Sequence, residues 1–463
     1  MCCLNHSSEP TRRQFIRDGL SVSAAVMSVL PATFDWRKTS ASVSPNKSNI
    51  DVARAAARWI ETAKIATDSG VTWLADPTDP ESVGTTLYHG SPGVVLFLLD
   101  LYHATGEEAY LNTACSGADA IMAVLQNEAE LPLGLYTGVA GMVFSLTETY
   151  RASNDRRYYA AAAQGLNILL GAAKSAGSGM EWNAVTDVIS GGSGIGLTLL
   201  NVAKTLKGTD ALDVAASAAY RLVEMGWPTS HGLKWPMSPD YQRLMPNFSH
   251  GTAGVSYYLA ALYQETGDPD LLDASLAGAR YLQSVAQTGD GDICLVFHNE
   301  PDGKDLYYLS WCHGPVGTAR LFYRLADVTQ DDEWLQWANM CAKAILQSGI
   351  PEQRTPGFWN NVSQCCGDAG VGEFFSSMYH VTGDQAYNDF LHRVRSSLLE
   401  RATEDTSGIR WLQAEHRTRP ELVAAQTGYM QGAAGIATFF LHLDAMENGR
   451  ESTVVLPDSP FAH

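Results

Sequence analysis

Residues 250–263 read HGTAGVSYYLAALY, a G-x-x-G motif that leads directly into a continuous apolar stretch. The copies of this pattern along the chain lie 48 to 65 residues apart, so each interval has room for two helices and their loops. The sequence therefore predicts a repeat protein of about seven helix pairs. The first glycines of the seven copies are Gly90, Gly138, Gly191, Gly251, Gly314, Gly367 and Gly432.

Turn signals follow the apolar stretch in several copies, as in ATGEEAYL (104–111), ETGDPDLL (265–272) and VTGDQAYN (381–388). Asp and Thr side chains at such turns can accept hydrogen bonds from the free N–H groups of a following helix, so these turns mark the start of the second helix. Strand signals are sparse, and only fragments such as DICLVFH (292–298) look extended. The pattern indicates an all-α chain.

The repeats are hydrophobic at both ends of the array, with no polar capping unit, and a closed ring needs no caps. We therefore expect a closed (α/α) toroid whose inner helices begin with G-x-x-G. Glycine there would let neighbouring units approach, and it would also permit a positive φ in the turn before the helix. This arrangement places the residues just before each G-x-x-G at one mouth of the ring.

The overall composition fits a large folded chain with an acidic surface. Of its 463 residues, 45% are hydrophobic, and 50 acidic residues outnumber 31 basic ones to give a formal charge of −19. This charge would repel nucleic acids and anionic membranes, so neither is expected as a partner.

The N-terminal residues resemble an export signal. Arg12 and Arg13 precede Phe15, Ile16 and a moderately apolar stretch from 20 to 32 that is too short for a permanent transmembrane helix. We expect residues 1–41 to be a twin-arginine signal peptide and residues 42–463 to form one toroidal domain, exported and not inserted in the membrane after cleavage.

Cysteines and histidines gather at the two positions before the first glycine of the repeats. Cys312 precedes one motif, and the adjacent Cys365 and Cys366 precede the next, in QCCGDAG (364–370). If the loops converge at one end of the ring, these three thiols can meet on one Zn²⁺ and leave its fourth tetrahedral position open, as in catalytic zinc sites. Histidines occupy the corresponding place at His89, His250 and His313.

Other readings of the cysteines stay open. Cys365 could form a disulfide with Cys366 or Cys312, or the pair could be a packing accident. Cys294 could act as a fourth ligand that closes the site, whereas Cys115 and Cys341 lie in helical runs where buried thiols are ordinary core residues.

The motifs WCHGPVG (311–317), QCCGDAG (364–370) and FSHGTAG (248–254), together with the seven repeats, resemble the lanthionine synthetase C-like (LanC-like) family over roughly residues 50–445. The resemblance implies an α/α toroid with one zinc ion, with Cys312 and Cys365 as ligands and Cys366 in place of the usual histidine. It also implies that His250 is the acid/base histidine and that Asp187 is an acidic residue near the metal. Many members carry an arginine shortly before the first zinc cysteine, and this chain has DLYYLSWC (305–312) there instead.

The chemistry implied is the addition of a thiol to a dehydroamino acid. Zn²⁺ would stabilise the thiolate of a substrate, which would attack the β-carbon of dehydroalanine or dehydrobutyrine and form a thioether. A histidine titrating near neutrality suits the protonation of the α-carbon, with His250 first and His313 and His89 as alternates. Asp187 could orient His250 or cap a helix. Tyr88, Trp311 and Trp359 could line the pocket or simply pack.

Several functions compete at this point. A lanthionine cyclase would need a peptide substrate and a separate dehydratase, whereas a related enzyme could add thiols to small electrophiles. A non-catalytic, zinc-stabilised peptide-binding module would need a fourth protein ligand such as His313 or Cys294. A carbohydrate-processing toroid would need paired carboxylates, for which Asp187, Asp368 and Glu373 are available.

Overall fold

The computed structural model describes residues 43–127, 130–241 and 243–461, so the predicted signal peptide at 1–41 lies outside the described residues. Each inner helix begins directly after the first glycine of a G-x-x-G motif, and an outer helix packs against it. The inner helices are α3 (Ser91–Thr105), α5 (Val139–Ser153), α7 (Gly192–Ala203), α9 (Thr252–Thr266), α11 (Pro315–Thr329), α13 (Asp368–Thr382) and α15 (Ala433–Glu447). The outer helices are α2 (Asn49–Glu61), α4 (Glu108–Asn127), α6 (Arg156–Ala172), α8 (Ala211–Glu224), α10 (Pro269–Val285), α12 (Asp332–Gln347) and α14 (Gln385–Arg401).

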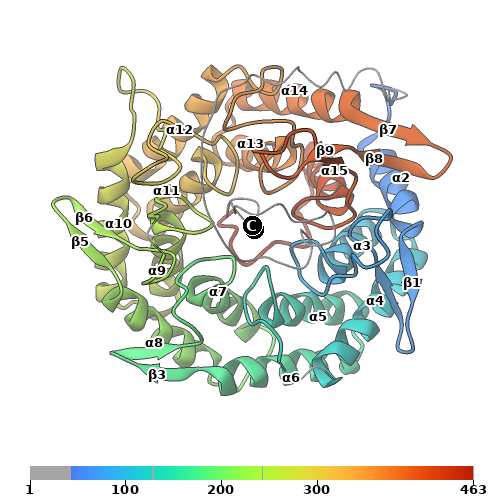
Figure 1. The fold of residues 1–463 in the computed structure, drawn as a ribbon, viewed down its shortest axis with the longest axis horizontal. Coiled ribbons are helices and arrows are strands. Elements are labelled where there is room, and N and C mark those ends of the chain that lie inside the picture. Colours follow the sequence, from blue (N-terminus) through green and yellow to red (C-terminus); the bar gives the residue numbers. More distant parts are fainter. Residues whose placement is uncertain (1–42, 128–129, 242, 462–463) are drawn as a thin grey trace.

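The helices form a closed ring (Figure 1). Each inner helix contacts the next one around the circle, and α15 contacts α3 to complete it. The outer partner of α15 is α2, which comes from the other end of the chain. The predicted all-α toroid of about seven helix pairs is confirmed, although the repeat pattern did not reveal that the N-terminal helix supplies the last outer position.

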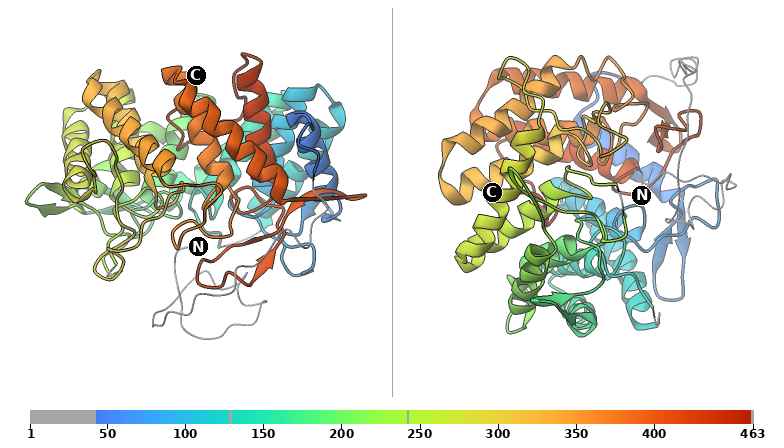
Figure 2. Two further views of the ribbon diagram at one scale, coloured as in Figure 1. Left: turned by 90° about the horizontal axis from the view of Figure 1, so that it is seen from above. Right: turned by 60° about the vertical axis from the view of Figure 1, so that its left-hand side comes forward.

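Short antiparallel hairpins follow several outer helices and project from the rim (Figure 2). The expected extended fragment at 292–298 forms no named strand and makes one isolated bridge, between Leu295 and Gln287. The strands are β1 (Lys64–Ala66), β2 (Val71–Trp73), β3 (Lys174–Ala176), β4 (Gly179–Glu181), β5 (Trp227–Thr229), β6 (Gly232–Lys234), β7 (Ala402–Asp405), β8 (Gly408–Trp411), β9 (Gln413–Ala414) and β10 (Val423–Ala424).

The turns between inner and outer helices start the outer helices, as the sequence predicts. The carboxylate of Asp155 accepts a hydrogen bond from the backbone N–H of Arg157 at the start of α6, and Asp268 does the same for Asp270 at the start of α10. Gly267 ends α9 in the left-handed region at φ 70°. One Asp therefore starts each of these outer helices directly after the inner helix ends.

The motif glycines are required by close packing and not by a positive φ, which corrects one expectation. Gly251 has φ −151°, which is extended backbone, but a Cβ there would lie 1.5 Å from the carbonyl oxygen of Met245 in its own loop. The second glycine is close both to its own loop and to the neighbouring unit: a Cβ on Gly254 would lie 2.1 Å from Phe248 O and 2.6 Å from Val188 Cγ2. Both glycines thus let the loop fold onto its helix, and the second also lets two units meet.

The loops before the glycines are joined to one another around the whole ring by main-chain hydrogen bonds. The Ser249 N–H donates to Cys312 O at 2.9 Å, the Cys312 N–H to Cys365 O at 3.2 Å, and the Cys365 N–H to Met430 O at 3.0 Å. The Met430 N–H donates to Tyr88 O, so the hydrogen bonds close into a circle. The remaining bonds of the circle run from Tyr88 N to Tyr136 O, from Tyr136 N to Ile189 O and from Val188 N to Ser249 O.

The C-terminal tail after α15 turns back into the centre of the ring (Figure 1). Asp458 is completely buried, and its carboxylate accepts hydrogen bonds from Tyr136 Oη at 2.9 Å, Trp311 Nε1 at 3.2 Å and Arg320 Nη1 at 2.8 Å. The Phe461 ring packs 4.6 Å from that of Tyr323 on α11. The tail therefore fills part of the bore beneath the loop that carries Cys312.

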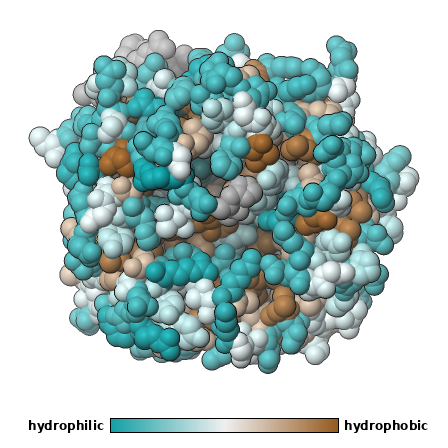
Figure 3. All heavy atoms as spheres, turned by 180° about the vertical axis from the view of Figure 1, so that it is seen from behind, coloured by the Kyte–Doolittle hydropathy of each residue, from teal (hydrophilic) through white to brown (hydrophobic). Residues whose placement is uncertain are grey.

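The face seen from behind is largely hydrophilic and has a hollow near its centre with apolar residues at its edge (Figure 3). Within the described part of the chain, no helix combines the length and the apolar character needed to cross a bilayer.

We predict that Asp458→Ala lowers the free energy of unfolding by about 2–4 kcal/mol, because it leaves the largely buried Arg320 guanidinium without its carboxylate. Chemical denaturation measures this change. Glu451→Ala, an exposed acid on the same tail, is the control and should stay within about 0.5 kcal/mol of wild type. Equal stability of the two variants would contradict a supporting role for the tail.

Candidate metal centre

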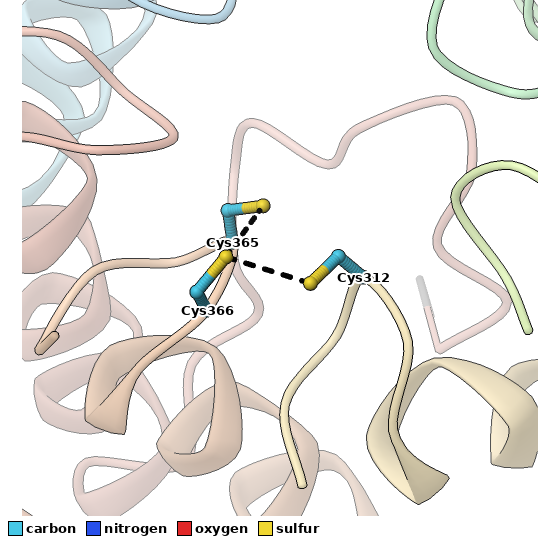
Figure 4. Close-up of side chains that lie close together, drawn as sticks. All are labelled: Cys312, Cys365 and Cys366. Atoms are coloured by element: carbon cyan, nitrogen blue, oxygen red, sulfur yellow. Dashed lines mark hydrogen bonds between the residues drawn. The ribbon is translucent and has the colours of Figure 1, made fainter. Parts of the chain in front are cut away.

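The three cysteines singled out from the sequence lie together at the mouth of the ring (Figure 4). Cys312 comes from the loop before α11, and Cys365 and Cys366 come from the loop before α13. The Cys312 and Cys366 sulfurs are 3.5 Å apart, those of Cys366 and Cys365 are 3.3 Å apart, and all three lie within 4.8 Å of one another. Two adjacent turns of the ring thus bring the thiols to one point.

The cluster has the composition and spacing that a soft metal ion requires. Three thiolates bound tetrahedrally at about 2.3 Å would stand roughly 3.8 Å apart, close to the separations observed. The three cysteines are free thiols and at most 2% exposed, so the disulfide alternative is not realised. Burial raises the pKa of the Cys365 thiol, so a cation is needed to make its thiolate favourable there.

No fourth histidine, cysteine or carboxylate joins the cluster among residues 43–127, 130–241 and 243–461. Cys294, the possible fourth ligand, lies elsewhere: its N–H donates to Met340 O at 3.0 Å, and its thiol interacts with that of Cys341. Other polar groups make weaker contacts with the cluster: Ser310 Oγ lies 3.7 Å from the Cys312 sulfur, Gln431 Nε2 lies 3.8 Å from the Cys366 sulfur, and the Tyr88 side chain interacts with the Cys365 thiol. The cluster can therefore offer three protein ligands to one metal ion.

Asp187 and His250 form a buried pair in the two loops that precede the cysteine loops. His250 Nδ1 lies 2.6 Å from Asp187 Oδ2, and the other carboxylate oxygen accepts the N–H groups of Ser190 at 2.7 Å and Gly191 at 2.8 Å. The main-chain donors fix the carboxylate, and a carboxylate can only accept from the ring, so Nδ1 carries the hydrogen. This leaves His250 Nε2 as the atom that can exchange a proton. Asp187 therefore orients His250 and fixes the turn before α7, but it does not cap that helix, whose N-cap Gly191 has no side-chain hydrogen bond.

His313 follows Cys312 and is completely buried, 5.6 Å from the His250 ring between centroids. Neither of its ring nitrogens has a hydrogen-bond partner within the described residues. Burial, with a smaller contribution from His298 and His250, lowers the pKa of His313 well below its usual value. Burying imidazole nitrogens without partners costs free energy, so a ligand or water is expected to meet them.

His298 is a site residue that the sequence analysis missed. Its ring lies 4.5 Å from that of His313 and 4.6 Å from that of Tyr308, which stands in the segment where the resemblance implies an arginine. Burial lowers the pKa of His298 to about 4. His298 belongs to the long connection between α10 and α11, outside the repeat pattern, so the repeat offered no signal for it.

Of the aromatic residues considered for the pocket, Trp311 and Trp359 pack away from the thiols, whereas the Tyr88 side chain interacts with the Cys365 thiol. Trp311 Nε1 donates to Asp458, Trp359 Nε1 donates to Ala414 O at 2.8 Å, and Tyr88 Oη accepts from Gln431 Nε2 at 3.0 Å. His89 is only partly buried, and its Nδ1 lies 3.5 Å from the Thr86 hydroxyl.

The fold and the cluster together define a closed α/α toroid with a three-thiol site at its mouth. The family model described as lanthionine synthetase C-like protein matches residues 81–456, and the chain belongs to this family. Among the curated proteins, none matches this chain in sequence.

Solved structures share the architecture at low sequence identity. A structure of nisin cyclase is similar with a TM-score of 0.60 and 18% identity, over 85% of this chain and 93% of that one. The Lin0763 protein from Listeria innocua has a TM-score of 0.51 and 14% identity, over 87% of this chain and 99% of that one. At these identities the likeness concerns the fold alone.

The pKa of His298 predicts a pH dependence of stability. The ring stays neutral in the folded protein down to about pH 4, whereas in the unfolded chain it binds a proton below about pH 6.5, so this contribution to stability is lost as the pH falls through that window. Between pH 7 and pH 4, wild type should lose about 2–4 kcal/mol more than His298→Phe.

Denaturant titrations at several pH values measure this difference. His231→Phe, which replaces an exposed histidine, should follow wild type. Parallel pH profiles of His298→Phe and wild type would show that His298 is not neutral in the folded state.

Proposed function

We propose that this chain adds a thiol to the β-carbon of a dehydroamino acid in a peptide, forming a thioether with Zn²⁺ held by Cys312, Cys365 and Cys366. The observation that carries the proposal is the cluster of three buried thiols, which offers three ligands and lies one loop away from the oriented His250. Membership in the lanthionine synthetase C-like family supports it, as does the fold shared with a protein named nisin cyclase.

The metal would supply one function, the stabilisation of the substrate thiol as a thiolate in the open ligand position. The chain's own residues do the rest. The three cysteine sulfurs, at most 2% exposed, keep the site dry and fix the position of the incoming sulfur. With a metal bound, three anionic sulfur ligands would make the substrate thiolate more nucleophilic than two sulfurs and a neutral imidazole would.

His250 is the proposed acid that completes the addition. Attack at the β-carbon moves the electron pair of the C=C bond onto the neighbouring carbonyl, and the α-carbon then needs a proton. His250 Nε2 can deliver it because Nδ1–H is held by Asp187, whose carboxylate also stabilises the charged ring. His313 and His89 have no such carboxylate bond within the described chain, which makes them weaker candidates.

The proposed reaction also determines what must supply the substrate. A peptide containing dehydroalanine or dehydrobutyrine has to come from a separate dehydratase, whereas a small electrophile would need no such partner. We also propose that the chain acts after export, because Arg12 and Arg13 precede a signal-like apolar stretch and the twin-arginine route carries folded proteins.

The competing functions fit the structure less well. A non-catalytic zinc module would need a fourth protein ligand, and none joins the cluster within the described residues. A carbohydrate-processing toroid would need two free carboxylates, but each candidate is engaged elsewhere: Asp187 with His250, Asp368 with Arg354 at 2.8 Å, and Glu373 with His442 at 3.0 Å.

We predict that the purified protein carries one zinc ion per chain and that Cys312→Ser or Cys365→Ser lowers this to about 0.1 or less, because two thiolates hold the ion too weakly. Elemental analysis by plasma emission measures the content. Cys341→Ala removes an equally buried thiol outside the cluster and should keep the metal. Zinc-free wild type that also fails to bind added Zn²⁺ would refute the metal centre.

We predict that His250→Ala lowers kcat for thioether formation by about 10²–10⁴-fold while zinc content stays unchanged, because the α-carbon loses its proton donor. Asp187→Asn should cause a smaller loss, since the ring keeps its place but loses the charge that stabilises its protonated form. Mass spectrometry of a dehydroalanine peptide incubated with a thiol follows the product. Equal rates in wild type and His250→Ala would remove His250 from the mechanism.

A further inference from the structure

His298 is held in place beside the candidate site, yet it has no role in the proposed thiol addition. Its backbone N–H donates to Leu306 O at 2.7 Å, and its carbonyl accepts from Asn247 Nδ2 at 3.3 Å. The side chain is only 8% exposed and packs between His313 and Tyr308. A buried polar ring fixed on both sides is suited to recognition.

The neighbouring residues determine which nitrogen of His298 carries the hydrogen. Asn299 Nδ2 donates to Asp302 Oδ1 at 2.7 Å, and Asp302 in turn pairs with Arg243 at 2.9 Å. The Asn299 amide is therefore oriented with its oxygen toward His298 Nδ1, which must donate to it. His298 Nε2 is left with a lone pair, is buried and has no partner among the described residues.

His313 complements this acceptor with a donor. An imidazole carries at least one N–H in every accessible protonation state, and both nitrogens of His313 lack partners in the described part of the protein. Its ring is 4.5 Å from that of His298 and belongs to the residue after Cys312. One acceptor and one donor thus stand side by side next to the thiol cluster.

A hydrogen-bond acceptor beside a donor matches the edge of an extended peptide. The N–H and C=O of one residue in an extended chain point to the same side, as they do where two strands pair. We propose that His298 Nε2 and His313 bind the backbone N–H and C=O, respectively, of one extended residue of the substrate. The assignment of that residue as the dehydroamino acid rests on the proposed function, whereas the peptide binding itself does not.

The proposal gives the pair a role in the reaction as well. The carbonyl bound by His313 is conjugated with the C=C bond of a dehydroamino acid, so it receives the electron pair when the C–S bond forms. The N–H of His313 then stabilises the oxygen on which negative charge develops. Return of that pair to the α-carbon, with a proton from His250, completes the addition without any oxidant or reductant.

Binding of two matched peptides to the zinc-loaded full chain tests the pair. One is acetyl-Gly-Ala-Gly amide, and the other contains lactate in place of alanine, so that a single N–H becomes an ester oxygen. We expect wild type to bind the alanine peptide about tenfold more tightly, since the ester cannot donate to His298 Nε2. In His298→Phe the two affinities should agree within about twofold, while His231→Phe keeps the wild-type ratio.

A second variant keeps the test decisive if His298→Phe does not fold. Asn299→Leu retains the imidazole but frees its tautomer, so the ratio of the two affinities should fall part of the way. Equal affinities in wild type, a ratio that survives in His298→Phe and Asn299→Leu, or no binding of either peptide up to about 10 mM would overturn the proposal.

The same protein assayed with dehydroalanine peptide and thiol separates this inference from the proposed function. If wild type forms no thioether but still prefers the alanine peptide in a His298-dependent way, peptide-edge binding stands and the catalytic proposal falls. If thioether forms while wild type binds the two peptides equally, the catalytic proposal stands and the binding pair is wrong.

Discussion

The closed circle of main-chain hydrogen bonds between the pre-glycine loops is the constraint on which the site depends. Each loop donates to one neighbour and accepts from the other, and the bond from Met430 to Tyr88 leaves no free end. Ser249, Cys312 and Cys365 are consecutive members of this circle, so the residues that follow them, His250, His313 and Cys366, are carried to the mouth by the same geometry. A helix bundle without closure would leave a terminal loop free and its side chains poorly placed.

The parts of this arrangement that belong to the repeated G-x-x-G motif could be predicted from the sequence. The glycines are visible because a Cβ at Gly251 or Gly254 would collide with backbone or with the next unit, and the cysteines are visible because they occupy equivalent positions before such glycines. The pairing of α2 with α15 could not be read, since α2 follows no G-x-x-G motif and its partner lies almost the full chain length away.

Residues outside the repeat had no comparable signal. His298 lies in the non-repeating connection before α11, and its tautomer depends on Asn299 and Asp302, whose orientation no local pattern predicts. Asp458 is an acidic residue, yet it is buried because its partners, Tyr136 and Arg320, come from distant parts of the sequence. Buried polar residues of this kind depend on tertiary contacts rather than on local propensity.

The tail and the loop circle together set the direction from which a substrate can approach. Trp311 precedes Cys312, and its Nε1 donates to the Asp458 carboxylate within the bore, so the part of the tail around Asp458 occupies the space beneath the Cys312 loop. Approach from the far side of the ring would require the tail to leave and would strip Arg320 of its carboxylate. The unpartnered nitrogens of His298 and His313 belong to rings 4.5 Å apart, and His313 directly follows Cys312, so these are the groups suited to meet a peptide beside the thiols. The tail thus supports the loop that carries Cys312 from within the bore, while the groups proposed for the chemistry lie in the connections that lead into the inner helices.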